Sequence, residues 1–228
     1  MIPWLDADDP FPPVEAAMAD PNGLLAAGAD LSMQRLLDAY RRGIFPWFGE
    51  DDPLLWWSPD PRMVLMPGEL HVSRSLRRVI RSGRYRVTLD TAFAEVMAGC
   101  AEPREDDAGT WITAEMVAAY GRLAALGFAH SVEVWSDTDL VGGLYGVAIG
   151  RMFYGESMFS RRSDASKVAL ATLVWQLERW GFEMIDCQMS TSHLASLGAR
   201  EIPRAEFVET LRRLVTLPPV ASPWRLVQ

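Results

Sequence analysis

The clearest patterns of apolar and polar positions lie in the second half of the chain. Strand-like runs cover residues 130–136, 140–148 and 152–158, and short polar or glycine-containing turns separate them. A helical pattern follows over about 164–180, and a buried strand is predicted over 184–189. Three strands in a meander, then a helix, then another strand predict an α+β sandwich.

Helix caps and stops organise the middle of the chain. Ser73 and Gly83 delimit a predicted helix, residues 85–89 form a predicted strand, and 92–100 form a second helix. Thr113 is positioned to cap a third helix that runs to Leu126.

Prolines are concentrated in the first part of the chain and limit its secondary structure. Ten of the fifteen prolines fall within residues 1–67, so this part can hold only short helices, such as 32–42. We predict a small irregular Pro- and Trp-rich domain over 1–62 that packs directly on a larger domain over 63–228.

Composition narrows the class of protein. The 228 residues are 49% apolar and 23% charged, and no apolar run approaches the roughly 20 residues needed to cross a bilayer. The first residues do not resemble a secretory signal, and two cysteines make no disulfide framework, so we expect a cytoplasmic protein. Three scattered histidines and two cysteines show no metal-ligand spacing, so no metal is expected.

The net charge of −8 argues against general affinity for nucleic acid, but its distribution matters. Residues 1–60 hold eleven acids and three arginines, whereas 61–228 hold nineteen charges of each sign. One face of the first predicted helix carries four arginines at i, i+3, i+4 and i+7, which are Arg74, Arg77, Arg78 and Arg81. They fit either a phosphate-binding surface or an ordinary solvated helix face.

Three polar residues interrupt the apolar strands. Glu156 lies within an apolar stretch, while Asp186 and Gln188 are spaced i, i+2 and so are expected on one strand face. A carboxylate among apolar residues is costly to bury unless it is paired or used. The alternatives are a polar pocket in an apolar wall, a solvated edge strand, or residues that only satisfy buried backbone groups.

A series of motifs connects these features with a known family. It runs in order from about Phe11 to Arg204: PNGLL (21–25), YRRGIFPWF (40–48), WWSPDPR (56–62), GTWIT (109–113), GGLYGV (142–147), GESMFS (155–160), DCQ (186–188), HLASLGA (193–199) and IPR (202–204). The sequence thereby resembles the leucyl/phenylalanyl-tRNA–protein transferases. This resemblance implies a GNAT-like α/β/α sandwich for the larger domain, no cofactor, and transfer of Leu or Phe, and Met less readily, to proteins with N-terminal Lys or Arg.

The resemblance also assigns binding residues. Trp47, Trp111, Tyr40 and Tyr120 match positions at the site of the tRNA's terminal adenosine, and the arginine helix would hold the acceptor stem. The residues that resemble the lining of the amino-acid pocket are Leu144, Phe153, Leu170, Leu173, Leu177 and Ile185. Family members carry Met or Phe where this chain has Leu144, Leu173 and Leu177, so the preference between Leu and Phe can differ.

For the chemical step, the resemblance implies that Asp186 orients Gln188, which contacts the attacking amine. We expect Asp186 to accept a hydrogen bond from the Gln188 amide, and Gln188 to position the amine, since an amide is a very weak base. Glu156 would hold the aminoacyl α-ammonium or the acceptor's basic side chain, and Glu156 with Asp186 would favour a basic N-terminus.

Two other functions remain open at the level of sequence. One is a GNAT-type acyl-CoA N-acyltransferase, although the stretch 160–167 lacks the glycines of a pyrophosphate-binding loop. The other is a non-catalytic module that binds RNA or N-terminal degradation signals. The expected partners are aminoacyl-tRNA and acceptor proteins, with no membrane, and we expect a monomer.

Overall fold

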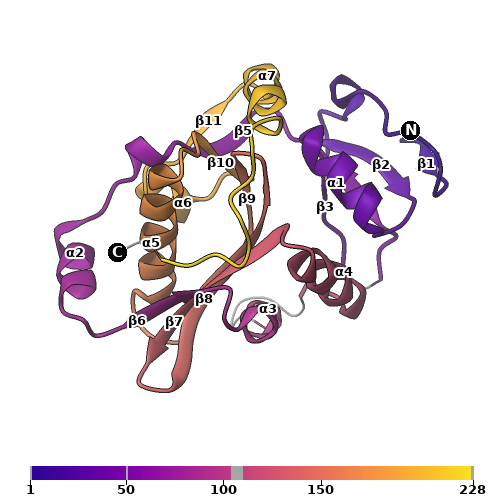
Figure 1. Cartoon of the computed structure of the whole chain (residues 1–228). Helices are drawn as coiled ribbons and strands as arrows, with labels where there is room; N and C mark the ends of the chain where they lie inside the picture. Colours follow the sequence, from indigo (N-terminus) through magenta and orange to yellow (C-terminus); the bar gives the residue numbers. More distant parts are fainter. Residues whose placement is uncertain (1, 50, 104–109, 227–228) are drawn as a thin grey trace.

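The computed structural model describes residues 2–49, 51–103 and 110–226, and these form two sheets with helices around them (Figure 1). The N-terminal sheet has the order β1-β2-β4-β3. Its elements are β1 (Trp4–Leu5), the 3-10 turn η1 (Val14–Ala16), β2 (Leu24–Gly28), α1 (Met33–Arg41), β3 (Phe45–Pro46) and β4 (Leu55–Trp57). This sheet was not predicted, because its strands have only two to five residues and are too short to show alternation.

The larger sheet has the order β11-β5-β10-β9-β8-β7-β6, and in it only β9 and β10 are parallel neighbours among the described strands. The first half of this part comprises β5 (Arg62–Leu65), η2 (Pro67–Glu69), α2 (Arg74–Arg81), β6 (Arg86–Leu89), α3 (Phe93–Ala101) and α4 (Ala114–Ala125). The second half comprises β7 (Ala129–Ser136), β8 (Asp139–Ile149), β9 (Met152–Ser160), α5 (Ala165–Arg179), β10 (Met184–Gln188), α6 (Ser192–Ser196), β11 (Arg200–Ile202) and α7 (Arg204–Leu214).

The large sheet is covered on both faces. Helix α5 packs on β7, β8 and β9, and its apolar side chains belong to one buried cluster. Helices α3 and α4 belong to the other cluster, which also contains the core of the N-terminal part (Figure 1). The predicted α+β class and direct packing of the two parts are thus confirmed, while the boundary between residues 62 and 63 stays a prediction.

Two irregularities in the large sheet determine the direction of the polar side chains. In the β8–β9 pair, Tyr145 faces Ser157 and Gly146 faces Gly155, so Glu156 is an extra residue in β9. In the β10–β5 pair, Asp186 faces Val64 and Gln188 faces Met63, so the residue between them is extra. Such bulges bend a strand and redirect side chains, often beside active sites.

Glycine at position 146 is required by the first bulge. A Cβ atom there would lie 2.2 Å from the carbonyl oxygen of Tyr154 and 2.5 Å from the ring of Phe153. The close approach of the two strands at this point is possible only without a side chain.

Candidate functional site

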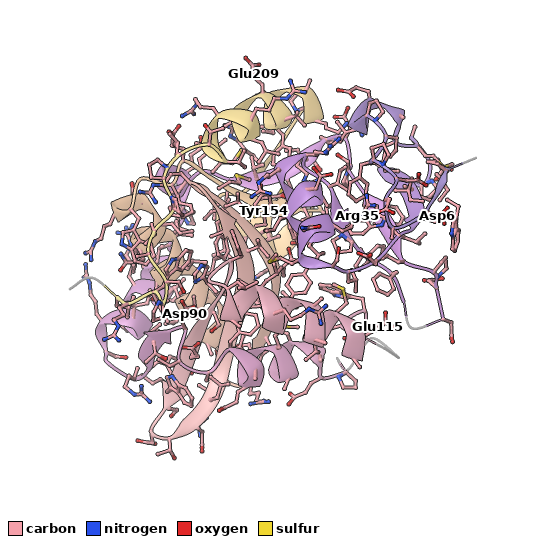
Figure 2. The ribbon with its side chains drawn as sticks, turned by 45° about the vertical axis from the view of Figure 1, so that its right-hand side comes forward. Asp6, Arg35, Asp90, Glu115, Tyr154 and Glu209 are labelled. Atoms are coloured by element: carbon pink, nitrogen blue, oxygen red, sulfur yellow. The ribbon has the colours of Figure 1, made fainter. Side chains whose placement is uncertain are left out.

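The three predicted catalytic residues lie together, Glu156 in the middle of β9 and Asp186 and Gln188 at the carboxyl end of β10. These strands pair in parallel only as far as Tyr154 and Asp186, and the polar residues follow at that point. In Figure 2 the labelled Tyr154 lies where the large sheet meets the N-terminal part, and its hydroxyl donates to the carbonyl of Tyr40 at 2.8 Å. The site is therefore built from both parts of the chain.

Glu156 is held by donors from three different elements. The Tyr40 hydroxyl of α1 donates to Oε1 at 2.7 Å, and the Tyr120 hydroxyl of α4 donates to Oε2 at 3.0 Å. The Gln188 amide nitrogen donates to Oε1 at 3.2 Å, and the two tyrosine hydroxyls also contact each other. The resemblance assigned Tyr40 and Tyr120 to the adenosine site and Glu156 and Gln188 to the chemical step, whereas in the structure these four residues form one contact cluster.

Burial dominates the electrostatics of this cluster. It raises the pKa of Glu156 to about 7, against the opposing effect of the two tyrosine donors. Burial, and then the neighbouring carboxylate, raise the pKa of Tyr40 and of Tyr120 well above the usual value for tyrosine. Both phenols therefore stay protonated and act as donors at neutral pH.

Asp186 forms a buried ion pair that its sequence spacing does not predict. Its Oδ1 accepts from Arg62 Nε at 2.8 Å and its Oδ2 accepts from Arg62 Nη2 at 2.6 Å. Asp186 is 0% exposed and Arg62 is 1% exposed. The charge of Asp186 is thus paired with that of Arg62 inside the protein. The expectation that Asp186 attracts the basic N-terminus of an acceptor is therefore not met, because its carboxylate is not accessible.

The contact between Asp186 and Gln188 also differs from the expected one. Asp186 Oδ1 accepts from the backbone N–H of Gln188 at 2.8 Å, whereas the Gln188 side-chain amide turns to Glu156. The reason is the bulge between them, which breaks the alternation that would place i and i+2 on one face. Gln188 has φ of 62°, in the left-handed region that non-glycine residues rarely adopt.

The two tryptophans predicted to bind the adenosine lie in different parts of the chain. Trp47 follows β3, is 38% exposed, and packs edge-on against Trp57 at 5.6 Å between ring centroids. Trp111 is half-buried just before α4 and packs against the larger core. Among the described residues no ring contact joins Trp47 to Trp111, and their shared role remains a prediction.

The six predicted pocket residues are brought together but tightly packed. All lie in the cluster between the large sheet and α5, and each is at most 5% exposed. Leu144, Phe153 and Ile185 come from neighbouring strands, and the other three come from α5. They form one packed apolar wall, and its role as a pocket lining remains a prediction.

The four arginines of α2 are exposed, as the helical spacing predicts. Ser73 caps the helix by accepting from the Leu76 N–H at 3.2 Å, and Leu76 is buried beneath it. Together with Ser82 the arginines line a surface hollow of about 570 Å³. None of them forms an ion pair with a described carboxylate, and their binding to tRNA phosphates remains a prediction.

Two negative findings concern the described residues alone. No group of three or more His, Cys, Asp or Glu side chains in this part of the chain could hold a metal ion. No helix there is long and apolar enough to cross a membrane.

The chain is similar in sequence to known proteins. A family model described as "Leucyl/phenylalanyl-tRNA protein transferase" matches residues 64–212, and a model of that family's N-terminal domain matches residues 29–60. The leucyl/phenylalanyl-tRNA–protein transferase of Nitrosospira multiformis is 62% identical over 224 residues, covering 98% of this chain and 97% of that protein. The enzyme of the same name from Thiobacillus denitrificans is 65% identical over 214 residues, covering 94% of each chain.

Solved structures show weaker similarity. A GCN5-related N-acetyltransferase from Kribbella flavida has a TM-score of 0.39 and 14% identity, over 72% of this chain and 59% of that one. L-PGS from Bacillus licheniformis has a TM-score of 0.38 and 10% identity, over 76% of this chain and 56% of that one. These scores are too low to carry a structural argument.

Proposed function

The chain belongs to the leucyl/phenylalanyl-tRNA–protein transferase family, and we propose that it moves Leu or Phe, and Met less well, onto proteins with N-terminal Lys or Arg. It is an aminoacyltransferase that uses aminoacyl-tRNA as donor and protein as acceptor. The modified proteins enter degradation by the N-end rule pathway. This assignment sets aside the acyl-CoA and non-catalytic alternatives.

The reaction is an aminolysis of an activated ester. The acceptor's α-amine nitrogen forms a bond to the aminoacyl carbonyl carbon, and the bond from that carbon to the terminal ribose oxygen breaks. The amine loses a proton and the ribose oxygen gains one. Because an α-amine has a pKa near ~8, it is already partly neutral at cellular pH, and positioning together with one proton transfer suffices.

One observation carries the proposed chemical step, namely the caged carboxyl of Glu156 with a pKa of about 7. A group with a pKa near the working pH is suited to accept and return a proton. Glu156 is therefore a stronger candidate for proton acceptor than the Gln188 amide. Since the Gln188 amide nitrogen donates to Glu156, its carbonyl oxygen can orient the attacking amine.

The proposed substrate contacts surround this carboxyl. The arginine face of α2 would hold tRNA phosphates without reading sequence, and Trp47 and Trp111 would stack on the terminal adenosine. The apolar wall between the sheet and α5 would receive the Leu or Phe side chain. An apolar pocket discriminates by only ~1–3 kcal/mol per methylene, so the preference is graded.

A transfer assay tests the proposal directly. Labelled Leu-tRNA is incubated with peptides that begin with Arg, Lys, Ala, Glu or acetylated Arg, and incorporation is measured. We expect label on the Arg and Lys peptides only. Equal labelling of the Ala peptide would remove the proposed acceptor specificity, and preferential use of acetyl-CoA as donor would overturn the function itself.

We further propose a cytoplasmic monomer. The donor is made in the cytoplasm, and the described cysteines, Cys100 and Cys187, are free thiols. Light scattering of the purified chain at micromolar concentration would give the mass of one 25.4 kDa chain. A dimer mass at that concentration would contradict the monomer.

A further inference from the structure

Arg62 is buried in the large sheet and has no role in the chemistry described above. Its guanidinium group lies between two aromatic rings, 4.8 Å from the centroid of Phe45 and 4.7 Å from that of Phe207. It also donates to the carbonyl of Gly43 at 3.2 Å. These contacts fix the position of the guanidinium group. Its bidentate hydrogen bonding to Asp186 then fixes the position of that carboxylate.

The consequence reaches Gln188 through the backbone. Asp186 Oδ1 accepts both from Arg62 Nε and from the Gln188 N–H. Gln188 has a left-handed backbone, which is strained for a residue with a side chain and persists only where neighbours enforce it. The bond from its N–H to Asp186 supplies that constraint at the bulge.

We propose that Arg62 is a positioning residue for the transfer reaction, acting through Asp186 on the main chain of Gln188 so that the Gln188 amide meets Glu156. The inference rests on the proposed function, since Gln188 must contact the reacting groups for its placement to matter. It gives Asp186 a different task from the one inferred from sequence. Asp186 holds the backbone of Gln188, and its negative charge is paired with Arg62 rather than with substrate.

A double-mutant cycle distinguishes positioning from simple stabilisation. Arg62→Lys keeps the charge but loses the planar fork that binds both carboxylate oxygens. In the wild-type background we expect a loss of about tenfold to a hundredfold in single-turnover rate, with donor affinity changed less than about twofold. Gln188→Gly removes the amide and accepts the left-handed backbone, so adding Arg62→Lys to it should cost little further rate.

Arg35 offers a matched control. It is also a buried arginine, it lies 4.9 Å from the ring centroid of Phe11, and it donates to backbone carbonyls including that of Asp9 at 2.6 Å. Figure 2 shows it in the N-terminal part, near the labelled Asp6, whose backbone carbonyl also accepts from it. Arg35→Lys should lower the melting temperature without lowering the single-turnover rate.

Each outcome decides the matter. Rate losses for Arg62→Lys that are equal in both backgrounds, or equal to those of Arg35→Lys, would show a merely structural role and overturn the proposal. If Arg62→Lys does not fold, Phe207→Leu loosens one side of the guanidinium with all charges kept, and the same coupling to Gln188 is expected at smaller size. An inactive wild-type chain would instead refute the proposed function.

Discussion

Glu156 receives three hydrogen bonds and still has its pKa raised to about 7, because burial outweighs the tyrosine donors. The carboxyl thus changes protonation near neutral pH. This property depends on the folded structure, since the neighbours come from α1, α4 and β10. Its effect can be measured both on stability and on rate.

The first prediction compares wild type with Glu156→Gln across pH. Between about pH 4.5 and 7 the unfolded chain loses the proton of Glu156 while the folded chain keeps it, so wild-type stability falls as pH rises. The difference amounts to up to about 3 kcal/mol and is complete above pH 7. Urea unfolding of both proteins from pH 4 to 8 measures it. Parallel stability curves for the two proteins would contradict the raised pKa.

The second prediction concerns Gln188→Glu. The new carboxylate would replace an amide that lies 3.2 Å from Glu156 Oε1, so two like charges would compete for one site. We expect a loss of single-turnover rate of about tenfold or more at pH 7, with the apparent pKa of the pair raised. A rate equal to or above wild type would show instead that residue 188 itself accepts the proton.

At the scale of elements, local signals predicted more than long-range ones. The caps Ser73 and Thr113 each accept from a backbone N–H three residues on, and the helices begin at the next residue, as the sequence indicated. The bulge between Asp186 and Gln188 and the pairing of β5 with β10 depend on partners distant in the chain. The spacing of residues along the sequence cannot by itself predict this bulge or this strand pairing.

Arg62 shows the same limit at a single position. Its motif marks it only as one of several matching residues, and its partner Asp186 lies 124 positions later. In the sequence, a carboxylate on a predicted buried strand, such as Asp186, does indicate that a cation must be buried with it. Which of the chain's arginines does so is fixed by the sheet order, in which β5 lies beside β10.

The third prediction tests helix α2. Arg77→Glu with Arg81→Glu should raise KM for aminoacyl-tRNA and reduce the slope of log affinity against log salt by about 1–2, because two phosphate contacts are lost. A short aminoacyl-adenosine donor lacks the stem phosphates, so its use should change little. Charge reversal at Arg212 and Arg225, both exposed elsewhere, serves as control. Equal loss with both donors would argue against binding of the stem.

At the scale of the molecule, the segment after α7 ties distant elements together. In Figure 1 this yellow segment crosses the large sheet towards α5. Trp224 near its end is 2% exposed and stacks on His130 with ring centroids 3.6 Å apart. Its backbone N–H donates at 2.6 Å to Asp90, which also bonds His130 at 2.8 Å. No strand or helix pattern in the sequence predicts this attachment, because it rests on one aromatic ring and one carboxylate.

The last prediction removes that ring. Trp224→Ala should lower the free energy of unfolding by about 3–5 kcal/mol, because a large cavity forms among His130, Trp180 and Phe153. Trp4→Ala is the matched control, since Trp4 is 67% exposed and its loss should cost within about 0.5 kcal/mol. Urea unfolding followed by far-UV circular dichroism measures both. Phe153 lies 6.0 Å from Trp224 between ring centroids and belongs to the predicted pocket, so the loosened wall should also change the ratio of Phe to Leu transfer. Unchanged stability would mean that the segment after α7 lies on the sheet without stabilising it. Reduced stability with an unchanged ratio of Phe to Leu transfer would mean that Trp224 does not influence the amino-acid pocket.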